Sequence, residues 1–332
     1  MQDVETPPCP PATGFATAVG RNGYQWWYID ALSDDRRFGL TLIVFVGSVF
    51  SPYYAAARRR GPADPANHCA INAVLYNPGG RKVWALTERG RDNLLRDETR
   101  LQVGPSSILW QEQQITVAID EITVPLPGRL RGEVRLELSG MNHDDHAIDP
   151  HGRHRWWPVS PCCRIAVDLQ NPRLSWQGEA YFDSNRGSEP LEAGFSGWDW
   201  SRATLADGSS IVQYHARPLN TATAPRSLAL HIDPEGRSRT ITPPRVMQLP
   251  RTAIWRISRQ SGTEASDGAR VLRTLEDTPF YARSMLETQL LGETVTAFHE
   301  SLSLTRFRQR WVQTLLPFRM PRNTKAVRGG PG

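Results

Sequence analysis

Four side chains near the middle of the sequence have the types and the spacing of an acid site. His154 and Trp156 lie two residues apart, and Tyr181 and Asp183 have the same separation. In an extended strand, residues two apart share a face, so two adjacent strands would bring all four groups together. The sequence therefore predicts a cluster that contains a carboxylic acid, an imidazole and two aromatic rings.

These groups suit proton-initiated chemistry on an apolar alkene. A carboxylic acid among aromatic rings is poorly solvated as an anion, which favours the proton-donating form of Asp183 near neutral pH. The imidazole of His154 could orient that acid or a water molecule, and the faces of Trp156 and Tyr181 could stabilise a developing carbocation. Spacing alone also allows a structural interpretation, in which Asp183 caps a turn and the other three belong to the core.

The elements that must position this cluster are short strands. Apolar, β-branched runs alternate with turn-forming clusters along the whole chain, and helical periodicity is almost absent. This pattern predicts an all-β chain of antiparallel strands, folded as barrels or sandwiches. The runs span residues 38–46, 70–76, 83–86, 108–119, 134–138, 165–169, 211–214, 228–232, 253–257, 271–275 and 295–304.

A turn-rich stretch at 184–190 divides the chain into two parts. We expect two β domains that meet near residues 185–195, with the active site between them or near their junction. The expected organisation is a flexible arm at 1–20, an N-terminal β domain at 21–190, a C-terminal β domain at 191–318 and a basic tail at 319–332.

Composition argues against several classes of function. The 332 residues carry a formal charge of +5, from 39 basic and 34 acidic side chains that form no long basic stripe. Neither nucleic acid nor a nucleotide is therefore an expected partner, and no phosphate-binding loop is present. The four cysteines lack zinc-ligand spacing, and we interpret Cys162 and Cys163 as core thiols. The polar loop at 142–151 holds histidines and aspartates, but we expect neither a metal nor a cofactor.

Two segments could contact lipid. Residues 305–320 mix arginine with phenylalanine, tryptophan and leucine, which fits either a last strand with a frayed end or an interfacial membrane segment. The arginines at 58–60 follow Tyr53 and Tyr54 and fit either a solvated loop or a phospholipid contact. The longest apolar run, residues 40–50, is about half of what a membrane span requires.

Six motifs in order along the chain together resemble the carotenoid 1,2-hydratase family, also called hydroxyneurosporene synthase. They are the segments 24–31, 45–54, 67–70, 87–90, 152–156 and 275–283, and the resemblance covers roughly residues 22 to 290. It implies a two-part, lipocalin-like β architecture, found also in pericyclases that form decalin rings. It further implies a hydro-lyase that adds water across the terminal 1,2 double bond of acyclic carotenoids such as neurosporene or lycopene, without a cofactor.

The resemblance also assigns roles. The family's His-x-Trp pair falls on His154 and Trp156, and its Tyr-x-Asp pair falls on Tyr181 and Asp183. Asp183 would protonate C2, a tertiary cation would form at C1 under the aromatic faces, and water oriented by His154 would be captured there. The expected substrate-binding residues are Trp27, Tyr53, Tyr54, Trp157, Trp198 and Trp200.

The expected partners are an acyclic carotenoid, water and a membrane. Because such a substrate dissolves in lipid, we expect peripheral attachment to the cytoplasmic side of the inner or photosynthetic membrane. Two alternatives stay open at this point: a non-catalytic lipocalin-like carrier of a polyene or other lipid, and a pericyclase relative that needs no proton donor.

Overall fold

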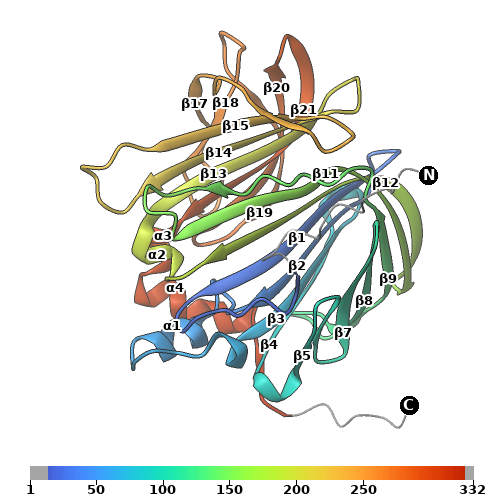
Figure 1. The fold of residues 1–332 in the computed structure, drawn as a ribbon, viewed down its shortest axis with the longest axis vertical. Coiled ribbons are helices and arrows are strands. Elements are labelled where there is room, and N and C mark those ends of the chain that lie inside the picture. The colour runs from blue at the N-terminus through green and yellow to red at the C-terminus, as the bar shows by residue number, and fades with distance from the viewer. Residues whose placement is uncertain (1–13, 326–332) are drawn as a thin grey trace, which may run out of the picture.

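The protein, described by a computed structural model over residues 14–325, consists mainly of β-strands in two large sheets (Figure 1). The first sheet has 13 strands, most of them in the N-terminal half of the chain. Its strands are β1 (Tyr24–Ser33), β2 (Gly39–Val46), β3 (Cys69–Tyr76), β4 (Lys82–Arg89), β5 (Leu94–Arg96), β6 (Arg100–Val103), β7 (Ser106–Gln111), β8 (Gln114–Ile122), β9 (Arg129–Glu137), β10 (His146–Ala147), β11 (His154–Asn171), β12 (Arg173–Gly187) and β22 (Arg322–Asn323).

The second sheet has seven strands, and two further strands form a small sheet of their own. The seven strands are β13 (Phe195–Thr204), β14 (Ser210–Pro218), β15 (Arg226–Ile232), β16 (Ser238–Thr240), β19 (Arg270–Asp277), β20 (Tyr281–Leu290) and β21 (Glu293–Ser303). The small sheet pairs β17 (Val246–Leu249) with β18 (Arg259–Gly262). The α-helices are α1 (Pro52–Arg58), α2 (Leu191–Gly194), α3 (Leu304–Phe307) and α4 (Arg310–Leu315), and the 3₁₀ helices span Pro65–Asn67, Pro78–Gly80, Arg91–Asn93 and Leu316–Phe318.

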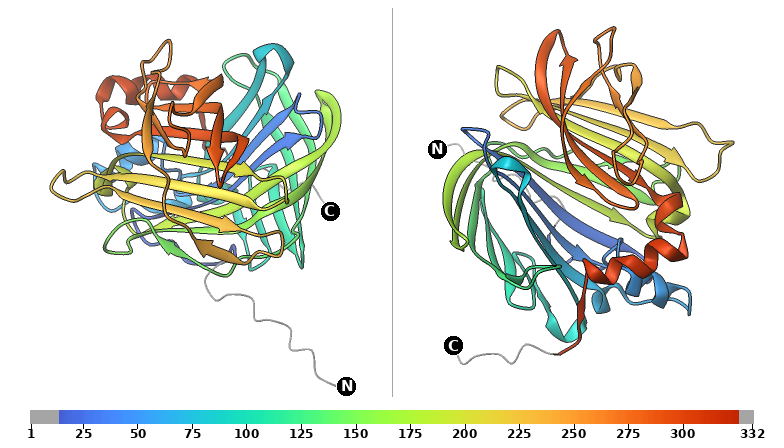
Figure 2. Two further views of the ribbon diagram at one scale, coloured as in Figure 1. Left: turned by 90° about the horizontal axis from the view of Figure 1, so that it is seen from above. Right: turned by 180° about the vertical axis from the view of Figure 1, so that it is seen from behind.

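The first sheet curls around a hydrophobic core (Figures 1 and 2). An isolated bridge between Ala85 and Thr123 brings β4 against the end of β8, although these strands are far apart in the order of the sheet. Fully buried side chains such as Ile71, Val117 and Val134 fill the inside of the curl. The predicted all-β architecture is thus confirmed.

Strand β1 is buried on both faces, and this places the functional region. Trp27 and Ile29 point into the core of the curled sheet, whereas Trp26 and Tyr28 belong to a second cluster that also contains Trp200 of β13. The alternation of side chains along one strand therefore gives the curled sheet an outer face that is covered by the second sheet.

The chain passes from the first sheet to the second between β12 and β13, in the region where the turn-rich stretch predicts a boundary. The division into two domains itself stays a prediction. Of the predicted arm, residues 1–13 lie outside the described residues, but Phe15 is fully buried with its ring 5.0 Å from that of Trp27. Of the predicted basic tail, 326–332 lie outside the described range, and β22 pairs in parallel with β4.

The C-terminal segment is helical, so its interpretation as a last strand is wrong. Helices α3 and α4 lead from β21 in the second sheet to β22 in the first, along one side of the molecule (Figure 2). Phe307, Val312 and Met320 are buried and anchor this segment to the cluster between the sheets. Within residues 14–325, no helix combines the length and the hydropathy that a membrane crossing requires.

Candidate active site

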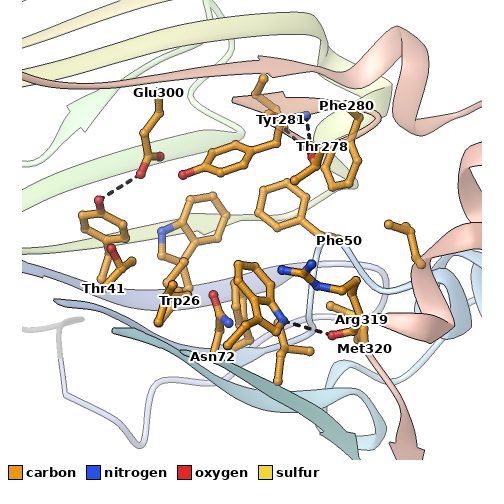
Figure 3. Close-up of a pocket in the computed structure, with 18 of the residues that line it drawn as sticks. Trp26, Thr41, Phe50, Asn72, Thr278, Phe280, Tyr281, Glu300, Arg319 and Met320 are labelled. Atoms are coloured by element: carbon orange, nitrogen blue, oxygen red, sulfur yellow. Dashed lines mark hydrogen bonds between the residues drawn. The ribbon is translucent and has the colours of Figure 1, made fainter. Parts of the chain in front are cut away.

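A cavity of about 420 Å³ lies between the curled sheet and the second sheet (Figure 3). Strands β1 to β4 contribute one wall, and β13, β14 and β21 contribute the other. Most of the lining is aromatic or aliphatic, and its carboxyl groups are those of Asp183, Glu300 and Asp277, the last of which accepts hydrogen bonds from the backbone amides of Ile254 and Trp255. The aromatic lining residues are Trp26, Tyr28, Phe45, Phe50, Tyr76, Trp84, Trp198, Trp200, Tyr214, Trp255, Phe280, Tyr281 and Phe318.

The Asp183 carboxyl group is held through one of its two oxygens. Oδ2 accepts a hydrogen bond from the Tyr181 hydroxyl at 2.7 Å and another from the Trp156 indole Nε1 at 2.9 Å. Oδ1 is buried and has no hydrogen-bond partner among the residues that the structure describes. Two neutral donors thus fix the orientation of the carboxyl group, and its second oxygen stays available for a proton.

Burial raises the pKa of Asp183 to about 7, because the charged form loses its hydration. The hydrogen bonds from Tyr181 and Trp156 oppose this shift by stabilising the carboxylate, and the negative charges of Glu300 and Asp30 add to it. No ion pair to Asp183 occurs in the described part of the chain. Near neutral pH, a large fraction of Asp183 is therefore protonated and can act as an acid.

The pairing of two long strands creates this arrangement. Strand β11 lies antiparallel to β12 with Trp156 opposite Asn185, so that the indole reaches Asp183 two residues away on the neighbouring strand. Tyr181 and Asp183 share one face of β12, which confirms the interpretation of their two-residue spacing. The structure therefore joins three of the four predicted groups in one hydrogen-bonded set.

His154 does not join this set, so the structure lends no support to the prediction that it orients the acid or the water, which stays a prediction. Its Nδ1 lies 2.9 Å from the Tyr24 hydroxyl and its Nε2 lies 3.3 Å from Glu189. The side chain is fully buried, does not line the cavity and has a pKa lowered by burial. His154 instead connects the end of β1 to the segment between β12 and β13, because the register of β11 places it opposite Gly187, at the end of β12.

Trp156 and Tyr181 also differ from the prediction, in that both are fully buried and are not lining residues of the cavity. They donate hydrogen bonds to Asp183, and their rings do not line the cavity. Tyr28 and Trp200 lie on the cavity side of Tyr181, with the ring of Trp200 5.6 Å from that of Tyr28 and 5.3 Å from that of Tyr181. These aromatic faces are thus available to a bound molecule.

The predicted substrate-binding residues divide into three groups. Trp198 and Trp200 line the cavity as expected. Trp27 and Trp157 lie inside the core of the curled sheet, because they occupy the opposite face of their strands. A further correction concerns α1, which holds Tyr53 and Tyr54 outside the cavity.

The two α1 tyrosines have structural contacts instead. The Tyr54 hydroxyl donates to the Gly23 carbonyl at 2.8 Å, and the guanidinium of Arg58 lies 4.3 Å from the centre of the Tyr54 ring. The ring of Tyr53 lies below the guanidinium of Arg322, with 5.9 Å between the Arg322 Cζ and the ring centre. Helix α1 therefore binds neighbouring segments of the protein through both of these aromatic side chains.

Several lining residues were not predicted from the sequence. Trp26 and Tyr28 belong to the first family motif, and their alternation with Trp27 could have indicated a second buried face. Asn185 shares a face of β12 with Asp183, and its amide donates to the Tyr214 hydroxyl at 3.2 Å. No pattern in the sequence marks Tyr214, because it becomes a wall residue only when the second sheet covers the first.

The mouth of the cavity is formed in part by the C-terminal segment. Leu315, Phe318 and Arg319 line it together with Trp255, and the carbonyl of Arg319 accepts a hydrogen bond from the Trp84 indole at 3.1 Å. Phe318 is 72% exposed, so the apolar lining continues onto the protein surface. The side chain of Trp255 stacks on Trp311, which is also exposed, with ring centres 5.9 Å apart.

Neither the cysteines nor the polar loop forms a second reactive centre in the described residues. Burial raises the pKa values of Cys162 and Cys163 to about 12, as expected for core thiols. In the same residue range, no group of three or more histidine, cysteine, aspartate or glutamate side chains could hold a metal ion. Asp145 of the polar loop is paired with Arg155 and Arg186.

Comparison with known proteins gives consistent results at the levels of sequence and fold. The family model for the carotenoid hydratase CrtC matches residues 42–328. The chain is 50% identical to the acyclic carotenoid 1,2-hydratase of Thiocapsa roseopersicina, over 94% of this chain and 76% of that protein. It is 36% identical to the enzyme of the same name from Rhodobacter capsulatus, over 85% of this chain and 97% of the relative.

Two solved structures share the fold at much lower sequence identity. An AttH-type protein from Nitrosomonas europaea superposes with a TM-score of 0.60 at 16% identity, over 91% of this chain and 98% of that chain. The protein CghA, solved with Sch210972, superposes with a TM-score of 0.55 at 11% identity, over 87% of this chain and 94% of the other. These similarities concern the arrangement of the two sheets.

Proposed function

The chain belongs to the carotenoid hydratase family, and from this premise we propose that it adds water across the terminal 1,2 double bond of an acyclic carotenoid such as lycopene or neurosporene. The observation that carries the proposal is the Asp183 carboxyl group. One of its oxygens has no hydrogen-bond partner among residues 14–325, it lines an aromatic cavity, and burial raises its pKa to about 7.

In the proposed reaction, the Oδ1 proton of Asp183 is transferred to C2 and the π electrons of the double bond form the new C–H bond. A tertiary cation remains at C1, where the faces of Tyr28 and Trp200 stabilise it electrostatically. A water oxygen then bonds to C1 and its excess proton is taken up by a base or by water in the cavity, which yields the tertiary alcohol. The Asp183 carboxylate regains a proton from solvent, so atoms and electrons balance without an oxidant.

Replacement of the acid tests this mechanism. Asp183→Asn keeps an oxygen that can accept from Tyr181 and Trp156 but removes the transferable proton, so we expect hydration to fall by roughly 10²–10⁴-fold. Purified protein would be incubated with lycopene and with neurosporene, and products would be identified by the mass gain of one water. Asp168→Asn is the matched control, because Asp168 is exposed and contacts Ser175.

The same assay separates the alternatives. Full hydration activity in Asp183→Asn would contradict the assigned acid. A carrier would bind the polyene, with a shift of its absorption spectrum, but would yield no product with the mass of one added water. A pericyclase would form an isomer of unchanged mass, and Asp183→Asn would still form it.

We also propose that the mouth of the cavity faces a membrane, on the cytoplasmic side of the inner or photosynthetic membrane. Four exposed apolar side chains support this, namely Ile254, Trp311, Leu315 and Phe318. Leu315 and Phe318 belong to the cavity lining, and Trp255, next to Ile254, also lines it. Such a surface would let a lipid-dissolved polyene pass from the bilayer into the cavity without crossing water.

A further inference from the structure

A second carboxyl group lies in the same cavity as Asp183. Glu300 is on β21, where it pairs with Trp200 of β13, and it lines the cavity. Its Oε1 accepts a hydrogen bond from the Tyr28 hydroxyl at 2.9 Å. Figure 3 shows the Glu300 side chain among the residues that line the cavity. Tyr28 is also the cross-strand neighbour of Asp183 in the β1–β12 pair. The backbone of Tyr28 therefore lies next to that of Asp183, and the Tyr28 hydroxyl contacts the carboxyl group of Glu300.

Glu300 has cationic neighbours, whereas no ion pair to Asp183 occurs among residues 14–325. Glu300 forms an ion pair with Arg283, whose Nη1 also lies 2.6 Å from the Tyr28 hydroxyl oxygen. Arg283 is fully buried and contacts Asp30 at 2.8 Å, and Arg202 contacts the same aspartate at 3.2 Å. The guanidinium groups of Arg202 and Arg283 thus contact the carboxyl groups of Asp30 and Glu300. The donors to Asp183 among the described residues are the neutral Trp156 and Tyr181.

We infer that Glu300 is the general base that takes the proton from the attacking water; this inference rests on the proposed function. After Asp183 has protonated C2, a water oxygen bonds to C1 and its excess proton passes to the Glu300 carboxylate. The proton then returns to Asp183 through water that refills the cavity, so that both groups regain their starting states. Acid and base are separate groups in this scheme: Asp183 is held by the hydrogen-bond donors Tyr181 and Trp156, and Glu300 is paired with the guanidinium of Arg283.

The test measures deuterium in the recovered carotenoid, because protonation at C2 in D₂O without capture of water leaves deuterium in the alkene. In D₂O, Asp183 delivers a deuteron to C2, and a cation that is not captured loses a proton to give the alkene back, partly deuterated. Glu300→Gln removes the base and retains the acid. We expect hydrated product to fall by roughly 10²–10⁴-fold, while deuterium still enters the recovered lycopene. Glu287→Gln is the matched control, since Glu287 is on the neighbouring strand β20 and pairs with Arg270 away from the cavity lining.

Two results would overturn the inference. Glu300→Gln could hydrate lycopene at the wild-type rate, or it could lose deuterium incorporation together with hydration, which would place its role at or before protonation. Circular dichroism would show whether Glu300→Gln folds. If it does not, Glu300→Asp and Glu300→Asn, whose side chains are equally short, compare a carboxylate with an amide at this position. Only the aspartate variant is expected to form hydrated product, and equal product from both variants would contradict a base.

Failure of the proposed function itself would look different. The wild-type protein would then yield neither hydrated nor deuterated carotenoid, and no comparison with the Glu300 variants would be needed. A wild-type protein that hydrates lycopene, with a Glu300→Gln variant that does so equally well, would remove only the assignment of the base.

Discussion

Asp183 is expected to set the pH dependence of hydration. The acid works only when protonated, and its pKa is about 7 because burial disfavours the charged form. The rate should therefore fall as the pH rises through about 7, where Asp183 loses its proton. Activity would be measured as product formed per unit time across this range, after checking that the protein stays folded.

Tyr181→Phe should move this midpoint upward. The Tyr181 hydroxyl stabilises the carboxylate of Asp183 by hydrogen bonding and so lowers its pKa, and its removal raises that pKa further. The falling limb of the pH–rate profile should shift to higher pH. Tyr53→Phe, a change outside the cavity, should leave the midpoint in place, and an unchanged or lowered midpoint in Tyr181→Phe would contradict the assignment.

The site residues differ in how far the sequence could predict them. Two-residue spacing was sufficient to predict that Tyr181 and Asp183 share a face, since side-chain alternation in a strand is regular. It could not tell that Trp156 reaches Asp183 and His154 does not, because the distance between groups on two strands depends on their register. Glu300 was missed for a related reason: it comes from the second sheet, more than a hundred residues away along the chain.

At the level of elements, β1 explains why some predicted lining residues were wrong. A strand that is buried on both faces has a nearly continuous apolar sequence, and such a sequence does not indicate which of the two faces borders a cavity. Trp27 was chosen from this strand, whereas Trp26 and Tyr28 are the residues that line the cavity. The all-β character, by contrast, follows from local patterns and was predictable, but the number of strands was not: the expected strand at residues 253–257 is a loop, and several short strands such as β5 and β16 lie outside the predicted apolar runs.

The exposed apolar side chains of the C-terminal helices allow a test of the proposed membrane contact. Replacing Trp311, Leu315 and Phe318 with serine removes exposed apolar area around the mouth while leaving the buried anchors in place. We expect a severalfold loss of binding to vesicles that contain anionic lipid, measured by sedimentation. A Leu95→Ser variant, which changes an exposed leucine on β5, is the control.

Deletion from Thr305 onward would be a poorer experiment. It would remove Phe307, Val312 and Met320, which are buried in the cluster between the sheets, and would open the cavity. Loss of membrane binding could then follow from unfolding alone. Vesicle binding by the triple serine variant at the wild-type level would show that the mouth makes no contact with lipid.

For the whole molecule, the contact between the sheets includes a buried ionic cluster beside the aromatic one. Asp30 of β1 is fully buried and contacts Arg202 and Arg283, which both belong to the second sheet. Asp30→Ala would leave two buried guanidinium groups short of a partner, at a cost of about 3–5 kcal/mol in the free energy of unfolding. Urea denaturation would measure it.

Asp34→Ala is the matched control for this measurement, because its ion pair with Arg164 is exposed to solvent. Its effect should be much smaller. Equal losses in the two variants would show that the buried cluster does not hold the sheets together. The sequence could not predict this cluster, since Asp30 and its partners are separated by most of the chain.

The size of the cavity has a consequence for the order of products. A volume of about 420 Å³ fits a drug-sized ligand, and an acyclic carotenoid is much longer than that. We therefore expect one end of the polyene to reach Asp183 while the rest of the chain stays outside the mouth. A symmetrical substrate must dissociate and turn around before its second end reacts, which makes the enzyme distributive: the singly hydroxylated carotenoid should accumulate first and the doubly hydroxylated one should follow.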